Sequence, residues 1–307
     1  MPPSPPPAPP PSPAQPGLII ARQPLAAGLY IVATPIGHLR DISLRALDVL
    51  ANAELVLCED TRRSRKLFAA YGLAVRCLSY HEHNAAARRP QILARLAKGA
   101  ALALVSDAGT PLISDPGYAL VAQARAAGHR VVPVPGASAP LAALAAAGLP
   151  TDRFSFVGFL PPKAAARART LSEFAALPHT LVAFERASRV RAALAAIATA
   201  MPQRDLVLAS ELTKWHERFW RGRAADLLEA LPPEPLKGEW VLLFAPAPAP
   251  VQDLKAEPEK AAEQWLAQEL QHHSVRDAVA RAAAQFGQSR QALYRTALRL
   301  SRKRETS

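Results

Sequence analysis

The sequence predicts an α/β protein of two domains, followed by a small helical module. A short apolar strand, a polar loop and a helix follow one another at least four times between residues 29 and 138. This alternation is typical of a parallel-rich α/β domain. A second set of apolar runs, between residues 154 and 244, predicts a further sheet, and two amphipathic basic helices end the chain.

The first α/β domain is expected over residues 18–136. Its strands are short apolar runs, predicted at residues 29–33, 54–58, 101–105 and 130–134. The helix after the first strand carries Leu44, Leu47 and Leu50 on one face, and either Asp41 or Ser43 is its cap.

Residues 106–117, SDAGTPLISDPG, are the most informative stretch of this domain. They follow the strand at 101–105 and contain two turns rich in Asp, Gly and Pro. Ligands of open α/β sheets bind at the ends of strands. A tight connection explains one such turn, but two turns bearing carboxyl and hydroxyl side chains favour a binding site.

The second α/β domain is expected over residues 137–245. It opens with an Ala-rich helix, and its strands form a mixed, partly antiparallel set, predicted at residues 154–158, 180–184, 206–209, 218–222 and 240–244.

Three further segments are set apart by composition. Residues 1–17 form a tail with ten prolines in its first sixteen residues, which predicts disorder or polyproline II. Residues 246–260 are rich in Pro and Ala and predict a linker. Residues 261–307 predict a basic helical module that binds RNA.

The module has clear helix boundaries. Ser274 is expected to cap one helix, Gly287 to end it, and Ser289 to cap the next. The buried stripe of the last helix leaves three arginines on its surface, Arg290, Arg295 and Arg299. This arrangement resembles a nucleic-acid-binding helix-turn-helix. A helical hairpin that docks on the main body or on a second subunit is the alternative, and both roles are compatible.

The net charge of +12 suggests a polyanionic partner, although a general bias toward Arg would also produce it. Half of this charge lies in residues 271–307, which hold eight basic and two acidic residues.

Cys58 and Cys77 do not have zinc-site spacing. The sequence shows neither a signal peptide nor an apolar run of membrane-spanning length, so a cytoplasmic protein is expected.

Eight short motifs occur in a recognisable order: TPIG (34–37), EDTR (59–62), SDAGTP (106–111), VPG (134–136), AGLP (147–150), GFLP (158–161), ELTK (211–214) and KGE (237–239). Together they resemble the tetrapyrrole-methylase-like (class III) methyltransferases, and within them the ribosomal RNA small subunit methyltransferases. The resemblance runs from about Leu29 to Phe244. His38 stands where this family usually has Asn.

The resemblance implies S-adenosylmethionine, held in the cleft between the two domains. The sequence has no dinucleotide-binding or Walker loop after a strand, which agrees with that cofactor. The expected cofactor-binding residues are Pro35, Ile36, Gly37, Ser106, Asp107, Ala108, Gly109 and Thr110. Ser138, Phe184 and Leu212 are weaker candidates, since packing alone could explain them.

The implied reaction is methyl transfer to the ribose 2′-hydroxyl of a decoding-centre cytidine in small-subunit ribosomal RNA. Positioning supplies most of the rate gain, and a general base assists. Glu59 and Asp60 are adjacent at a strand end, where like charge would raise one pKa; alternatively, Asp60 caps the following helix. The remaining candidates for catalysis are Asp115, Glu211 and Lys237, and the sequence does not rank them.

Arg62, Arg63 and Arg65 form a basic run beside the first two loops, which is either a solvated helix face or a track for phosphates. His81 belongs to HEHN (81–84), which lacks a third metal ligand nearby, so we predict a substrate-contacting loop and no metal.

Ribosomal RNA, or the assembled small subunit, is the expected partner, and family members dimerise. The rival hypotheses are a small-molecule methylase acting on tetrapyrroles or diphthine precursors, and a non-catalytic RNA-binding relative.

Overall fold

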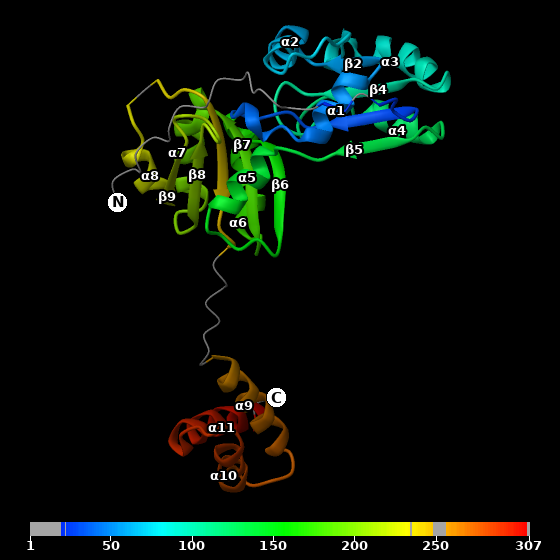
Figure 1. The fold of residues 1–307 in the computed structure, drawn as a ribbon. Coiled ribbons are helices and arrows are strands. Elements are labelled where there is room, and N and C mark those ends of the chain that lie inside the picture. Colours follow the sequence, from blue (N-terminus) through cyan, green and yellow to red (C-terminus); the bar gives the residue numbers. More distant parts are fainter. Residues whose placement is uncertain (1–19, 22, 234, 248–255, 306–307) are drawn as a thin grey trace. The chain divides into compact units, whose positions relative to one another are not determined.

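The structure is a computed structural model that describes residues 20–21, 23–233, 235–247 and 256–305. The expected Pro-rich tail (1–17) and residues 248–255 of the expected linker lie outside the described residues. The chain divides into two compact units, Met1–Ala247 and Pro248–Ser307 (Figure 1).

The first unit begins with a five-stranded sheet in which all neighbouring strands are parallel. In the order β3-β2-β4-β1-β5, its strands are β1 (Gly28–Val32), β2 (Leu55–Cys58), β3 (Cys77–Ser79), β4 (Ala101–Val105) and β5 (Val131–Val134). The predicted α/β class is therefore confirmed. Strand β3 was not predicted, because three half-buried residues are too few to show a periodic apolar pattern.

Helices cover both faces of this sheet (Figure 1). α1 (Leu44–Asn52) and α2 (Thr61–Ala70) pack on one face, and α3 (Glu82–Ala97) and α4 (Tyr118–Ala126) on the other. Ser43 is the cap of α1, because its hydroxyl accepts from the Ala46 N–H, whereas Asp41 lies in the preceding 3₁₀ turn, Leu39–Asp41.

Strands β1 and β4 lie side by side, yet the helices that follow them, α1 and α4, lie on opposite faces. Their connecting loops therefore diverge above the carboxyl ends of the strands. Such a topological switch point is where open α/β sheets bind ligands.

The second sheet of this unit is mixed, with order β6-β7-β10-β8-β9, and β6–β7 is its parallel pair. Its strands are β6 (Phe154–Phe159), β7 (Thr180–Arg186), β8 (Asp205–Ser210), β9 (Arg218–Arg223) and β10 (Glu239–Phe244). The helices around it are α5 (Ala139–Ala146), α6 (Ala164–Ala175), α7 (Val190–Ala200) and α8 (Ala224–Ala230), and a 3₁₀ turn, Ala187–Arg189, precedes α7.

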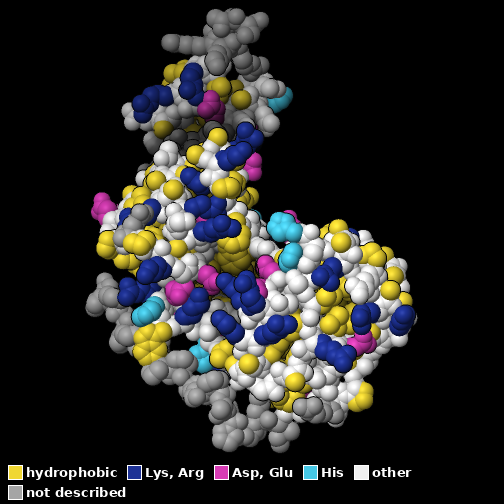
Figure 2. Space-filling model, turned by 90° about the horizontal axis from the view of Figure 1, so that it is seen from above, with side chains coloured by type: hydrophobic (Ala, Val, Ile, Leu, Met, Phe, Trp, Pro, Cys, Tyr) yellow, Lys and Arg dark blue, Asp and Glu magenta, His cyan; other side chains and the backbone are white. Residues whose placement is uncertain are grey.

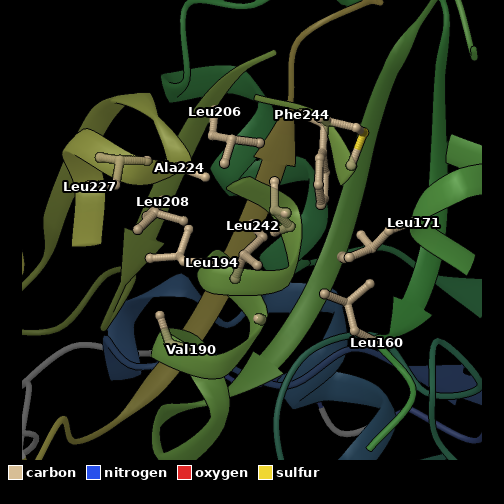
Figure 3. Packing of buried hydrophobic residues seen from close by; sticks show 14 of the residues in the cluster. Leu160, Leu171, Val190, Leu194, Leu206, Leu208, Ala224, Leu227, Leu242 and Phe244 are labelled. Atoms are coloured by element: carbon tan, nitrogen blue, oxygen red, sulfur yellow. The ribbon is translucent and has the colours of Figure 1, made fainter. Parts of the chain in front are cut away.

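Alternation along the strands builds two apolar layers on this sheet. Leu206 and Leu208 face α6, α7 and α8, whereas Val207 and Ala209 face α5. Figure 3 shows the first layer, in which Leu194 of α7 lies among strand side chains that include Leu242. Burial of each such leucine stabilises the fold by roughly 1.5–3 kcal/mol. The second layer also contains Ile36, so the loop after β1 is packed into the core of the second domain.

The second unit contains α9 (Ala256–Glu269), α10 (Val275–Phe286) and α11 (Arg290–Glu305) around a small apolar core. Ser274 caps α10, and Gly287 ends it with a left-handed φ of 63°. The expectation of a linker up to residue 260 is wrong from residue 256 onward. Pro258 falls in the first turn of α9, where a missing N–H costs little, and the residues around it favour helix. Across the part of the chain described, no helix is long and apolar enough to cross a membrane.

Candidate active site

Two backbone hydrogen bonds join the loops that follow β1 and β4. Thr34 N–H donates to the Gly109 carbonyl (2.9 Å), and Gly109 N–H donates to the Thr34 carbonyl (3.0 Å). Gly109 has a φ of 80°, and a Cβ there would lie 3.3 Å from Ile36 Cγ2. Glycine is therefore required for this close, left-handed approach. Thr34 also donates its hydroxyl to the Ser106 carbonyl (3.2 Å), a role that sequence reasoning did not assign although Thr34 opens the TPIG motif.

The loop at 106–117 is held by its own side chains. Ser106 Oγ lies 3.2 Å from both the Ala108 and the Gly109 carbonyl oxygens, and Thr110 donates to the Ala137 carbonyl (3.1 Å). Leu112 and Ser114 have φ values of 72° and 67°. Backbone strain of this kind persists where the surrounding structure over-determines the conformation, and it gathers at functional sites.

The loop after β8 reaches the same place from the second domain. Glu211 and Thr213 are the other two non-glycine residues with positive φ in the described chain, at 53° and 62°. His38 N–H donates to Thr213 Oγ1 (3.0 Å). A Cβ on Gly37 would lie 2.5 Å from Lys214 Cγ and 2.8 Å from the Leu212 carbonyl oxygen, so the two loops are in direct contact.

His38, the departure from the family pattern, makes this contact with its backbone. Its ring Nδ1 accepts from the Arg40 N–H (3.2 Å) and caps the 3₁₀ turn, which an Asn side chain can also do. The contact with Thr213 uses the His38 backbone and so does not depend on which side chain stands there.

Most of the expected cofactor residues are brought together by these contacts: Pro35, Ile36, Gly37, Ser106, Asp107, Ala108, Gly109, Thr110 and Leu212. Phe184 is half-buried in the apolar cluster that contains Ile36 and Leu212. Ser138 follows Ala137, whose carbonyl accepts from Thr110. The hydroxyls of Ser106 and Thr110 organise the loop, so what these two residues offer a ligand is their backbone.

Three carboxyl groups gather at the ends of β2 and β4. Asp107 accepts from the Asp60 N–H (3.0 Å) and pairs with Arg63 (3.4 Å). Burial, and then the charge of Asp107, raise the pKa of Glu59 above its ordinary value. Burial, and then the charge of Glu59, raise the pKa of Asp115 to about 6, against a hydrogen bond from Ser106 that lowers it. The like-charge neighbour of Glu59 is thus Asp107, rather than Asp60 as the sequence suggested.

Asp60 caps helix α2, which was the alternative to a catalytic role. Its carboxylate accepts from the Arg62 N–H (2.8 Å) at the start of α2 and pairs with the Arg62 side chain (3.2 Å). The side-chain hydrogen bond from Arg62 lowers the pKa of Asp60. An exposed, capped carboxylate of low pKa is a weak proton acceptor.

The two catalytic candidates of the second domain lie at one end of its inner strands, Glu211 after β8 and Lys237 before β10. Glu211 Oε1 accepts from the Glu239 N–H (3.0 Å) and from Lys214 Nζ (3.0 Å). Lys237 is exposed, and its carbonyl accepts from the Trp240 indole (2.9 Å). These contacts shape the loop that touches Gly37.

The arginines expected to contact RNA are exposed. Arg62, Arg63 and Arg65 project from α2, and the side chains of Arg62 and Arg63 stay 86% and 69% exposed despite their ion pairs. Figure 2 shows Lys and Arg side chains together with Asp and Glu around a hollow on one face of the molecule.

His81 does not lie in a free loop. It precedes α3, and its N–H donates to Asn84 Oδ1 (2.9 Å) in a capping arrangement. Its Nδ1 is buried without a partner in the described structure, and the ring is close enough to Glu59 to act on that carboxyl's pKa. No His, Cys, Asp and Glu cluster suited to a metal is found among the residues that are described.

Comparison with known proteins gives two family matches. Residues 28–228 match the Tetrapyrrole (Corrin/Porphyrin) Methylases, and residues 256–301 match the RsmI C-terminal HTH domain. A protein of Mesorhizobium japonicum named Ribosomal RNA small subunit methyltransferase I is 45% identical, over 92% of this chain and 95% of its own length. The protein of that name in Escherichia coli O157:H7 is 42% identical, over 88% of this chain and 94% of its own length.

Two solved structures share the fold at low identity. A diphthine synthase has a TM-score of 0.54 at 16% identity, covering 71% of this chain and 89% of its own. A uroporphyrin-III-C-methyltransferase from Thermus thermophilus has a TM-score of 0.50 at 23% identity, covering 71% of this chain and 94% of its own.

The raised pKa of Asp115 predicts a pH-dependent effect of Asp115→Asn on stability. As pH rises from about 4 to about 6, the unfolded chain releases this proton first, so the wild-type protein loses stability over that window. Removing the charge should raise the melting temperature at about pH 8 and leave it unchanged at about pH 4. Thermal unfolding at both pH values measures this, with Asp152→Asn, an exposed carboxyl, as the control. An equal change at both pH values would contradict the assignment.

Proposed function

Because the chain belongs to the tetrapyrrole methylases, and within them to the ribosomal RNA small subunit methyltransferase I family, we propose that it methylates the ribose 2′-oxygen of a decoding-centre cytidine in small-subunit (16S) ribosomal RNA. The family makes it a methyltransferase with S-adenosylmethionine as cofactor. The observation that carries the proposal is the meeting of the loops after β1, β4 and β8 at the switch point, beside the exposed arginines of α2.

The residues at this meeting point fit the cofactor. Ile36, Leu212 and Phe184 offer apolar walls, and the turn at Gly109 brings the backbone of the 106–110 loop close to Ile36. A nucleoside needs this combination of apolar surface and a few fixed donors and acceptors. S-adenosylmethionine, when bound, supplies a methyl group already activated by its sulfonium.

Within the proposal, the protein's chemical contribution is to place the ribose hydroxyl and to take its proton. Asp115 is the best candidate for the proton acceptor, because a pKa of about 6 matches neutral working conditions. Glu59 contributes by keeping that pKa high, and Arg63 holds Asp107 in place. Asp60, Glu211 and Lys237 have structural contacts and are set aside as bases.

RNA is the substrate class that the charge supports. Arg62, Arg63 and Arg65 would contact phosphates beside the cleft, and Arg290, Arg295 and Arg299 would add contacts from the C-terminal module. The substrate is ribosomal RNA or the assembled small subunit, in the cytoplasm. A small-molecule methylase has no need of a basic module that matches a family HTH domain, and a non-catalytic relative has no need of strained, intact cleft loops.

The test is methyl transfer from labelled S-adenosylmethionine to small ribosomal subunits that lack the modification, with naked ribosomal RNA for comparison. We expect one cytidine to become resistant to alkaline cleavage at its ribose. Cofactor binding by calorimetry without any transfer to RNA would overturn the ribosomal assignment and favour the small-molecule methylase. Failure to bind the cofactor would favour the non-catalytic relative.

Asp115→Asn should reduce kcat by about 10²–10⁴-fold, the usual range for loss of general base catalysis. The affinity for S-adenosylmethionine, measured by calorimetry, should change little. In the wild-type enzyme kcat should fall below about pH 6, as Asp115 takes up its proton. A variant with wild-type kcat and the same pH profile would show that another group, or water, accepts the proton.

We also propose that the enzyme is a homodimer. Exposed apolar side chains lie around the junction of the domains: Ile113 (41% exposed), Tyr118 (78%) and Phe159 (50%). The Gly158 backbone lies next to Ser114, which brings the end of β6 to the 106–117 loop. Sedimentation should therefore give a dimer for the wild type and a monomer for Phe159→Asp. A monomeric wild type at micromolar concentration would refute the dimer.

A further inference from the structure

A hollow of about 570 Å³ lies between α10 and α11 in the C-terminal unit. α10 lines it with Arg276, Val279 and Ala280, which occupy one helix face at spacings of three and four residues. From α11 it is lined by Arg290, Gln291, Tyr294 and Arg295. The volume falls in the range of sites that accept small ligands.

The floor and wall of the hollow are apolar and aromatic. Val279 is 4% exposed and belongs to the core of the unit, whereas Tyr294 is 46% exposed. Tyr294 lies outside the apolar cluster that packs the three helices. A large aromatic side chain left open beside an apolar floor offers a flat surface on which a planar group can stack.

The rim is positively charged and is not neutralised. Two other arginines of the unit have carboxylate partners: Arg281 with Glu269 (2.7 Å) and Arg299 with Glu263 (2.6 Å). Arg276, Arg290 and Arg295 form no ion pair within the described residues. Asp277, beside Arg276, is engaged by the Ser274 hydroxyl (2.6 Å) at the helix cap.

We propose that this hollow holds one unpaired nucleotide of RNA, with its base stacked on Tyr294 and its phosphate bound by Arg276, Arg290 and Arg295. Guanidinium groups bind phosphate oxygens through paired hydrogen bonds, and aromatic side chains stack on any base. The inference rests on the proposed function in one respect, that the C-terminal unit binds RNA. It names the form of RNA that is bound.

The shape of the site favours an unpaired nucleotide over a duplex. A recognition helix reads DNA by entering the major groove, but the major groove of an RNA helix is too narrow for side chains to read. A concave site with an aromatic wall instead accepts a base that is already out of the stack. Such bases occur in the single-stranded loops and bulges that proteins recognise in folded RNA.

The test uses the full-length protein and fluorescence anisotropy with three labelled probes: a single-stranded oligoribonucleotide, a strand of the same length without bases, and an RNA duplex. Tyr294→Ala should weaken binding of the single strand by about tenfold, the order expected for loss of one stacked base. Its affinity for the base-free strand and for the duplex should not change. Tyr294→Phe should behave as wild type, because the stacking ring is retained.

Arg276→Gln should weaken binding of both the single strand and the base-free strand. It should also reduce the slope of log affinity against log salt concentration by the amount expected for about one phosphate contact. Leu298→Ala is the matched control, since Leu298 is exposed on α11 and lies outside the lining of the hollow. Thermal unfolding of each variant confirms that the module remains folded.

If Tyr294→Ala binds all three probes as wild type does, or weakens the base-free strand equally, the hollow is not a nucleotide site. That result would leave the proposed function standing if the wild-type protein methylates ribosomal RNA. Conversely, loss confined to the base-bearing single strand supports the hollow even if methyl transfer to ribosomal RNA is not found.

Discussion

The pair of hydrogen bonds between Thr34 and Gly109 is the constraint on which the site depends. It holds the loops after β1 and β4 together at the point where their helices depart to opposite faces of the sheet. With that crossing in place, Ile36 is fixed in the apolar layer of the second domain, and Gly37 and His38 meet the loop after β8. The site is therefore formed by backbone and side-chain contacts whose partners come from three segments far apart in the sequence.

Charge within the cleft follows from the same geometry. The crossing places Asp107 beside the start of α2, where it accepts from the Asp60 N–H and pairs with Arg63. Burial is the main reason why the pKa values of Glu59 and Asp115 both rise, and like charge adds to it, chiefly from Asp107 on Glu59 and from Glu59 on Asp115. Asp60 is one residue further along, but it faces the helix cap and solvent and has a lowered pKa. Adjacent positions in the sequence thus have opposite electrostatic environments.

The sequence was sufficient for the fold class, since strands and helices of regular period bury themselves in a predictable way. It missed β3, whose three residues carry no periodic signal, and it did not predict α9, because the Pro- and Ala-rich stretch that includes Pro258 suggested a linker. At the site, the loops could be predicted from Gly, Pro and Asp at strand ends. The direction in which each side chain points could not be predicted. An Asp at position 60 is equally suited to cap a helix and to act as a base, so the sequence alone does not distinguish the two roles. Contacts made by tertiary structure, such as Asp107 with Arg63, decide between them.

Phosphate contacts and base contacts do different things in RNA recognition, and the two surfaces proposed to contact RNA differ in the groups they offer. The helix α2 bears exposed arginines and no exposed aromatic side chain, so the phosphate contacts proposed for it would not distinguish one RNA sequence or structure from another. The hollow between α10 and α11 combines unneutralised arginines with an exposed tyrosine, the combination that the proposed site for an unpaired nucleotide needs. If the enzyme methylates a single ribose, as we propose, it requires such discrimination in addition to affinity, because every nucleotide of RNA carries a 2′-hydroxyl. A nucleotide site apart from the cleft would supply it without adding groups to the catalytic pocket itself.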